Sequence, residues 1–196
     1  MAKSDPAVAK KERNKTIKWV ITIFLVTIVI SGTISLLSDV LMENSSMGVA
    51  FLILLVIILV GIVFDIIGMA VATADEKPFH SMAARKVPGA FEAIRLLRNA
   101  ERVSSICNDV VGDICGVVSG SASATIAVQI LRNFDFTWPQ MISLLMSAMA
   151  AGLTVGGKAI GKSFAVNSCT QIVHGVGRGI HALHNFPDVF RKKKKN

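Results

Sequence analysis

The ten residues Phe51-Leu-Ile-Leu-Leu-Val-Ile-Ile-Leu-Val60 are all apolar, and they decide the fold. They belong to a hydrophobic stretch from Val49 to Ala74 in which Asp65 is the only charged residue. About 20 residues of helix cross the roughly 30 Å hydrocarbon core of a bilayer, so this stretch is long enough to span a membrane. A soluble domain can bury one such helix, but hardly two. The chain has a second stretch of this kind, from about 17 to 41.

The hydrophobic stretches predict an all-α, integral membrane helical bundle with about four transmembrane helices. The stretch at 17–41 is too long for the apolar part of a signal peptide and has no small-x-small cleavage site at its end, so we expect it to be retained. The chain then divides into a basic cytoplasmic tail, a transmembrane domain and a juxtamembrane helix with a second basic tail. These parts are 1–16, 17–165 (spans 17–41, 49–73, 103–131 and 139–160, with interfacial helices at 78–102) and 166–196.

The net charge of +8 comes largely from basic residues beside the hydrophobic stretches. Lys and Arg are retained on the cytoplasmic side of spans, next to anionic lipid headgroups. This rule predicts a multi-pass protein of the plasma membrane with both termini in the cytoplasm, and anionic lipid rather than nucleic acid as the partner of the basic tails. The basic residues at the two ends are Lys3, Lys10, Lys11, Arg13, Lys15, Lys18 and Arg191-Lys-Lys-Lys-Lys195.

A polar-apolar segment between the second and third spans predicts an amphipathic helix. Pro88 suits the first turn of a helix, and Phe91, Ile94 and Leu97 then share one face. Arg95, Arg98 and Arg102 share another face. We expect this helix to lie at the cytoplasmic membrane surface, although a soluble cap would use the same pattern.

Polar residues inside the predicted spans are the candidate functional residues. Ionisable residues in a span are costly, face the bundle interior as a rule, and often mark pathways for ions. Carboxylate, amide and hydroxyl oxygens are hard ligands that suit Mg²⁺ or Na⁺ rather than zinc. The candidate ligands are Asp65, Asn108, Asp109, Gly112, Asp113 and Ser119. Asp109 and Asp113 are four residues apart and would share a helix face. The alternative is a structural polar network in which Lys158 supplies the counter-charge.

Glycines recur every four residues in the third and fourth spans. Small residues at this spacing let two helices approach closely, within one subunit or across a dimer. The glycines predicted to pack are Gly112, Gly116, Gly120, Gly152 and Gly156. The partner helix cannot be read from the pattern.

Two further patterns suggest chemistry but lack the context that it needs. The segment Gly156-Gly-Lys-Ala-Ile-Gly-Lys-Ser163 matches the phosphate-binding GxxxxGK[ST] pattern. A phosphate-binding loop follows a buried strand, whereas a run of small, helix-forming residues precedes this one. His174, His181 and His184 have helical spacing, which leaves a transition-metal site open but favours neutral or interfacial histidines. We therefore expect no enzyme, and no disulfide framework from Cys107, Cys115 and Cys169.

From Gly61 to about Gly177 the chain resembles the transmembrane domain of the CNNM/CorC (CorB) magnesium transporter family. Phe64-Asp65-Ile-Ile-Gly-Met-Ala70 stands where that family has a Phe-Ser-Gly-x-Glu-Thr-Ala-like motif, and Pro88-Gly-Ala-Phe-Glu-Ala-Ile-Arg-Leu-Leu97 resembles the helix after it. Ile106-Cys-Asn-Asp109 is similar to an Ile-Gly-Asn-Asn motif, with Asn108 on the ion-binding Asn. Gly157-Lys-Ala-Ile-Gly-Lys162 falls on a Gly-Glu-x-x-Pro-Lys motif, with Lys158 in place of the acid.

The resemblance implies a homodimer that exports Mg²⁺ in exchange for Na⁺ entry. It places Asp65 on an ion-binding Ser of the family, which keeps an oxygen ligand there. The family's cytoplasmic CBS domains have no counterpart in these 196 residues, and the span at 17–41 is extra. Two function classes follow: a cation transporter or exchanger with Asp65, Asn108, Asp109 and Asp113 at its site, or a membrane scaffold in which Lys158 holds the acids in ion pairs.

Overall fold

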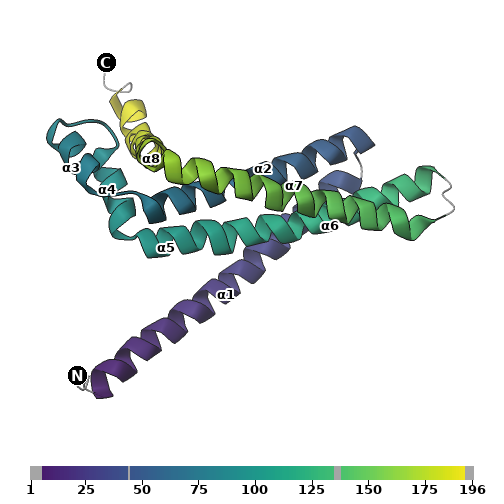
Figure 1. Cartoon of the computed structure of the whole chain (residues 1–196), viewed down its shortest axis with the longest axis horizontal. Helices are drawn as coiled ribbons and strands as arrows, with labels where there is room; N and C mark the ends of the chain where they lie inside the picture. Colours follow the sequence, from purple (N-terminus) through teal and green to yellow (C-terminus); the bar gives the residue numbers. More distant parts are fainter. Residues whose placement is uncertain (1–5, 44, 135–137, 193–196) are drawn as a thin grey trace.

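The computed structural model describes residues 6–43, 45–134 and 138–192, and over these residues it is all-α (Figure 1). The basic residues Lys3 and Lys193–Lys195 lie outside the described residues, as do residues 135–137 of the loop between the third and fourth spans. The elements are α1 (Pro6–Glu43), α2 (Met47–Thr73), α3 (Lys77–Ala84), α4 (Ala90–Arg98), α5 (Ala100–Ser105), η1 (Ile106–Gly112), α6 (Asp113–Asn133), α7 (Pro139–Asn167) and α8 (Cys169–Lys192).

Within the described residues, four segments are long and apolar enough to cross a membrane, as the sequence predicts: Ile17–Met42, Met47–Thr73, Ala100–Asn133 and Pro139–Asn167. The third segment is one continuous rod made of α5, η1 and α6, so it begins before the predicted residue 103. The fourth extends seven residues beyond the predicted end at residue 160. Lys158 lies within the predicted span, and the extension places Lys162 inside α7 as well.

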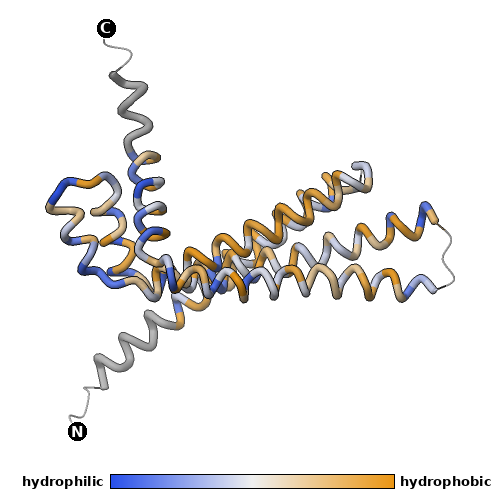
Figure 2. The backbone as a smooth tube through the Cα atoms, turned by 45° about the horizontal axis from the view of Figure 1, so that its top comes forward, coloured by the Kyte–Doolittle hydropathy of each residue, from blue (hydrophilic) through white to orange (hydrophobic). Residues whose placement is uncertain are grey.

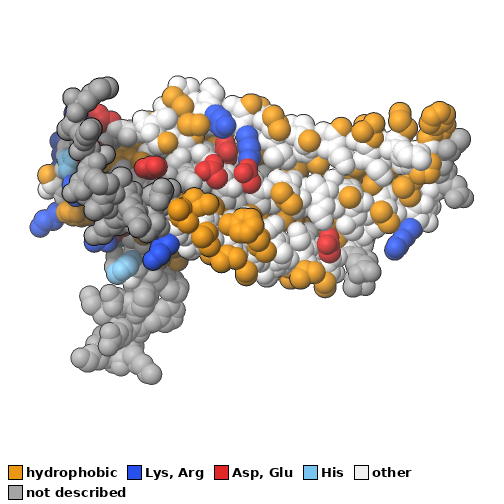
Figure 3. Space-filling view, turned by 90° about the horizontal axis from the view of Figure 1, so that it is seen from below, with side chains coloured by type: hydrophobic (Ala, Val, Ile, Leu, Met, Phe, Trp, Pro, Cys, Tyr) orange, Lys and Arg blue, Asp and Glu red, His pale blue; other side chains and the backbone are white. Residues whose placement is uncertain are grey.

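The bundle has α2 at its centre, packed against α6 and α7. Leu54 and Ile58 of α2, Ile126 of α6 and Met146 of α7 form an apolar core between the three helices. Helix α1 packs on α6 and then diverges from the bundle toward its own N-terminal end (Figure 1). Apolar side chains also cover much of the outer surface, where lipid rather than water is their natural neighbour (Figure 3).

A cap of α3, α4 and α8 closes one end of the bundle (Figure 1). Phe79 of α3, Ala93 and Ile94 of α4 and Val173 of α8 are buried together against the end of α2. Helix α8 turns away from the long axis of the bundle as soon as α7 ends (Figure 2). Hydrophilic and hydrophobic residues alternate along the part of α8 next to the bundle, as in a helix that lies at an interface.

The segment 78–102, where interfacial helices are expected, contains most of α3, all of α4 and the start of α5. Gly89 has a left-handed φ of +85° and lies against the backbone of Arg178, so α4 begins only at Ala90. Ile94 is buried inside the protein against α8, whereas Phe91 on the same predicted face is 64% exposed. The apolar face of α4 therefore packs mainly within the cap, and Phe91 is the part of it that remains for a membrane surface.

A contact between Glu92 and His181 joins α4 to α8, and it predicts acid sensitivity of the cap. His181 Nδ1 lies 2.8 Å from Glu92 Oε1, and this hydrogen bond lowers the pKa of Glu92 below its ordinary value. A carboxyl with a lowered pKa stabilises the fold above its ordinary pKa and loses that contribution as the pH falls. We expect spin-label distances between α4 and α8 to lengthen below about pH 4.

The substitution Glu92→Gln tests this prediction, because it removes the ionisable group and should remove the acid-induced change. Glu76→Gln is the matched control, since Glu76 contacts Arg98 and His80 rather than α8. An unchanged α4–α8 distance in the wild type between pH 6 and pH 3 would contradict the proposed role of this contact.

Candidate functional site

The candidate site lies where α2, η1 and α7 meet, and Asp65 is its central acid. Asp65 is only 4% exposed, although α2 is otherwise a helix of apolar and small side chains. Its Oδ1 atom lies 3.8 Å from Nζ of Lys158, which reaches it from α7. Its Oδ2 atom is buried and has no hydrogen-bond partner among the described residues. A charge-assisted hydrogen bond is normally 2.7–2.9 Å long. Lys158 therefore balances the charge of Asp65 but does not form a short hydrogen bond with it.

A π-helix forms the second wall of the site. Residues Ile106–Gly112 form seven consecutive π-helical residues inside a spanning rod that is otherwise α-helical. Runs of π-helix are rare, and they occur frequently at functional sites because the wider turn redirects side chains and carbonyl groups. Asn108 lies within this run, where its Nδ2 donates to Ser104 Oγ at 3.3 Å. The other end of the amide, Oδ1, is buried and has no partner among the described residues.

Two glycines, Gly68 and Gly112, let α2, η1 and α7 approach one another closely at the site. Gly68 of α2 packs directly on the side chain of Asn108, and a Cβ atom at Gly68 would overlap the amide oxygen. Gly112 faces Lys158, whose Nζ donates to the Gly112 carbonyl at 3.4 Å. A Cβ atom at Gly112 would lie 3.3 Å from that Nζ and 4.0 Å from Asp65 Oδ1. The carboxylate of Asp65 and the carbonyl of Gly112 thus share the ammonium group of Lys158. The amide oxygen of Asn108 lies against Gly68, three residues further along α2 than Asp65.

The structure separates the three acids that the sequence groups together. Asp65 is buried, whereas Asp109 and Asp113 are exposed, and Asp109 Oδ2 accepts a hydrogen bond of 2.9 Å from Ser105 Oγ. No group of three or more His, Cys, Asp or Glu side chains that could hold a metal ion occurs within the described ranges. Asp65 contacts Lys158 inside the bundle, whereas Asp109 and Asp113 lie at the exposed surface of the rod.

Ser119, another predicted ligand, lines a different part of the bundle from Asp65. It is buried, and its hydroxyl donates to the carbonyl of Gly116 on its own helix at 2.9 Å. The residue lines a groove between α6 and α7 instead. Because its hydrogen atom is used by the helix backbone, Ser119 contributes to the packing of α6 in this structure.

Only one of the five glycines predicted to pack against another helix does so within the described chain. Gly112 does meet another helix, through Lys158. A Cβ atom at Gly116, Gly120, Gly152 or Gly156 would meet nothing within 4 Å, so these four do not mediate close packing within the chain. Packing across a dimer stays a prediction for them. The close contacts between helices occur instead at Gly61 and Gly68 of α2, and at Gly157 and Gly161 of α7, which receive the side chains of Ile62 and Ile66.

A signal for the glycines of α2 was present in the sequence. Gly61, Asp65 and Gly68 are spaced i, i+4 and i+7, which places them on one face of a helix. Most side chains of this helix are large and apolar, so a face with two glycines and one acid indicates where another backbone approaches. The charge of Asp65 makes it a candidate from the sequence alone. The small residue Gly68 on the same face explains how the side chain of Asn108 packs directly on α2.

The segment that matches the phosphate-binding pattern lies wholly inside α7. Its backbone N–H groups are therefore engaged in a continuous helix and cannot cradle a phosphate group. Gly157 and Gly161 of this segment pack on α2, and Lys158 faces Asp65. Helix packing and the counter-charge thus account for the pattern.

The three histidines of the predicted carboxyl-terminal segment all lie on α8. His181 contacts Glu92, and Nε2 of His174 is buried with no hydrogen-bond partner within the described part of the chain. All three cysteines are free thiols. Comparisons with protein-family models, with curated proteins and with solved structures found no match to this chain. The chemistry of its own residues must therefore support any function.

Proposed function

We propose that the protein is a membrane transporter or exchanger for a cation, with Mg²⁺ or Na⁺ as the substrate. The observation that carries this proposal is a pair of buried oxygen atoms without hydrogen-bond partners among the described residues, Asp65 Oδ2 and Asn108 Oδ1. Buried polar atoms are nearly always satisfied in folded proteins, so unsatisfied ones need an explanation such as an ion. Carboxylate, amide and carbonyl oxygens are the ligands that Mg²⁺ and Na⁺ prefer.

Lys158 gives this proposal a mechanism. An ammonium group at 3.8 Å from Asp65 Oδ1 occupies the position of a counter-ion, and it balances the buried charge when no cation is bound. Lys158 is 20% exposed at its side chain, so it can withdraw toward the end of the bundle when a cation enters. The entering ion then takes the contacts of Asp65, Asn108 and the Gly112 carbonyl. Sites of this kind, formed by interrupted helices inside a bundle, are typical of secondary transporters.

The resemblance to the CNNM/CorC family supports the same residues, because Asp65 and Asn108 fall on its ion-binding positions. By the same resemblance we propose a homodimer. Both α1 and α8 have their terminal ends toward the cap end of the bundle (Figure 1), and an even number of spans requires both ends on one side. We propose that this side is cytoplasmic, in the plasma membrane, with the basic tails against anionic lipid.

A second candidate function is that of a non-transporting scaffold or regulator. The contact of Lys158 with both Asp65 and the Gly112 carbonyl favours it, because a permanent Lys–Asp pair would close the site to cations. In this case the polar network would fix how α2, η1 and α7 pack, and no ion would affect the protein. Both candidates are non-enzymatic.

Thermal unfolding and ion flux decide between the two functions. We expect Mg²⁺ or Na⁺ to stabilise the purified protein in detergent beyond a choline chloride control of equal ionic strength. Ligand at 100 times its Kd stabilises a protein by about 2.7 kcal/mol. The substitution Asp65→Asn should remove this stabilisation and the corresponding flux into proteoliposomes. Asp113→Asn should retain both, because Asp113 is exposed.

Two results would contradict the transport proposal. One is a wild-type protein whose stability and flux do not respond to Mg²⁺ or Na⁺, which would favour the scaffold. The other is a response that persists in Asp65→Asn and disappears in Asp113→Asn, which would move the site to the exposed acids.

A further inference from the structure

A groove of small side chains runs along the outer face of α6 and α7. It has a volume of about 240 Å³, and glycine, alanine and serine dominate its lining, among them Gly116 and Gly120 of α6 and Ser147 and Ala151 of α7. A Cβ atom at either glycine would meet nothing within 4 Å, so this face is open in the single chain. Small residues let a neighbouring helix approach at backbone distance. A small-residue groove alone does not identify the neighbour.

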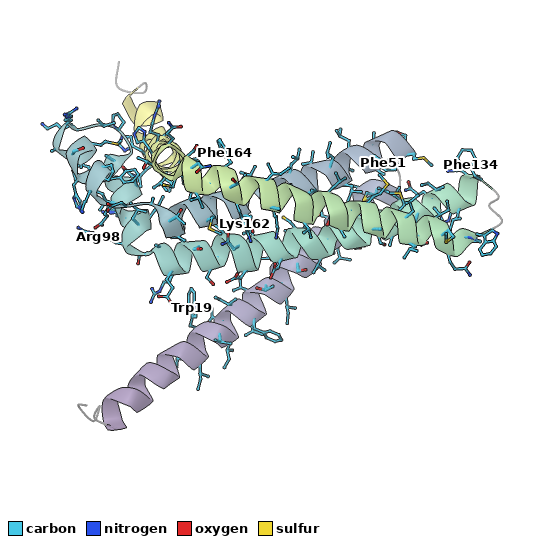
Figure 4. The ribbon with its side chains drawn as sticks, in the orientation of Figure 1. Trp19, Phe51, Arg98, Phe134, Lys162 and Phe164 are labelled. Atoms are coloured by element: carbon cyan, nitrogen blue, oxygen red, sulfur yellow. The ribbon has the colours of Figure 1, made fainter. Side chains whose placement is uncertain are left out.

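Charged residues of both signs continue the same face toward the cap. Lys158 Nζ bonds the Gly112 carbonyl, which fixes the register of α7 against η1. Lys162 is one turn further toward the cap, so it lies at the level of Asp109 on the neighbouring rod. Figure 3 shows acidic and basic side chains gathered at one place on the spanning helices, and Figure 4 shows Lys162 between α7 and that rod.

These charges are not paired with one another inside the chain. Asp109, Asp113 and Lys162 are all exposed, and no salt bridge of 4 Å or less joins Lys162 to either acid among the described residues. Asp and Lys are unfavourable by about 2.5–3.5 kcal/mol at the centre of a span, and the cost declines toward the headgroups. A short Asp side chain reaches toward the headgroups less well than Lys does. A partner that supplies the opposite charges would therefore stabilise this face.

We propose that the α6–α7 face binds the same face of a second copy of this chain. A two-fold axis along the membrane normal keeps every residue at its own depth, so Lys162 of one protomer meets Asp109 of its partner. The face carries acids on one helix and a lysine on the other, which makes it complementary to itself. The groove beside these charges admits the partner helix along Gly116 and Gly120. This inference locates the proposed dimer contact and is independent of whether the protein transports ions.

The oligomeric state in lipid vesicles tests the proposal, by dilution of fluorescently labelled protein and measurement of energy transfer. The double substitution Gly116→Leu with Gly120→Leu should lower the dimer association constant at least tenfold. Because both Cβ positions are open in the single chain, the helix content and the thermal unfolding of the protomer should not change. Gly32→Leu is the matched control: Gly32 is equally open but lies on α1, and its substitution should leave the dimer intact.

Charge reversal tests the pairing of charges between the two protomers separately from the steric effect of the added leucine side chains. Lys162→Asp and Asp109→Lys should each weaken the dimer, and the double variant should restore it. A wild-type protein that is monomeric at all protein-to-lipid ratios would overturn the proposal. Dimers that survive the double leucine substitution, or a double charge reversal weaker than either single one, would also overturn it.

Discussion

Replacing Lys158 by alanine is expected to lower the free energy of unfolding by about 3 kcal/mol in the absence of added cations. Removal of one partner from a buried ion pair costs about 3–5 kcal/mol, because the other charge remains buried and uncompensated. The lower end applies here because Lys158 is partly exposed and its Nζ lies 3.8 Å from Asp65 Oδ1. Chemical denaturation of the purified protein in detergent would measure the loss.

A double substitution identifies the cause of that loss. Asp65→Asn removes the charge that Lys158→Ala leaves stranded, so the double variant should be more stable than Lys158→Ala alone. Mg²⁺ should also rescue Lys158→Ala if the site takes a cation, because the ion then replaces the ammonium group. Rescue by Asp65→Asn without any rescue by Mg²⁺ or Na⁺ would support the scaffold. An unchanged stability of Lys158→Ala would refute the ion pair itself.

Replacing Gly68 by valine is expected to destabilise the bundle by about 3 kcal/mol, the upper part of the range for overpacked sites. The first added atom alone would overlap the Asn108 amide oxygen, and would lie 2.8 Å from Asn108 Cγ and 3.0 Å from Cys107 Cβ. The contact involves the π-helix, so α2 and η1 must separate to relieve it. The yield of monodisperse protein and its thermal unfolding would report the effect.

Two companion variants make the Gly68 prediction specific. Gly32→Val on α1 adds the same atoms where nothing lies within 4 Å, and it should be tolerated. Combining Gly68→Ala with Asn108→Ala removes the amide that the added Cβ meets, and should recover part of the stability that Gly68→Ala loses. Equal stability of Gly68→Val and Gly32→Val would falsify the proposed close approach of α2 to Asn108.

The sequence predicts the spans well because their signal is strong and local. A run such as Phe51–Val60 has no other stable solution than burial in lipid or in a large core. The end of the fourth span was harder to predict, because Lys162 follows the predicted end at residue 160 and resembles a boundary between membrane and cytoplasm. In the structure α7 continues past Lys162, and the close packing of Gly157 and Gly161 on α2 explains why the helix persists there.

The candidate site could be predicted only in part. Asp65, Asn108 and Lys158 are conspicuous as polar residues in apolar surroundings, and the structure places all three at the junction of α2, η1 and α7. The exposure of Asp109 and Asp113 could not be predicted, because it depends on which side of the rod packs against α2 and α7. The partners of the glycines depend on tertiary packing, which periodicity alone does not contain.

Helix α8 has a mechanical consequence. It is joined to α7 only through Ser168, and its 24 residues form an arm about 36 Å long. Its first half is fixed to the cap, because Val173 is buried against α2 and α4, Gly177 meets the backbone of Gly89, and His181 contacts Glu92. A rotation of α8 together with the cap by roughly 10° about Ser168 would sweep the far end through about 6 Å, since displacement grows with distance from the pivot. A rearrangement of α7 too small to alter the bundle would thus be amplified at the distal end of the arm, where Arg191 and Lys192 lie.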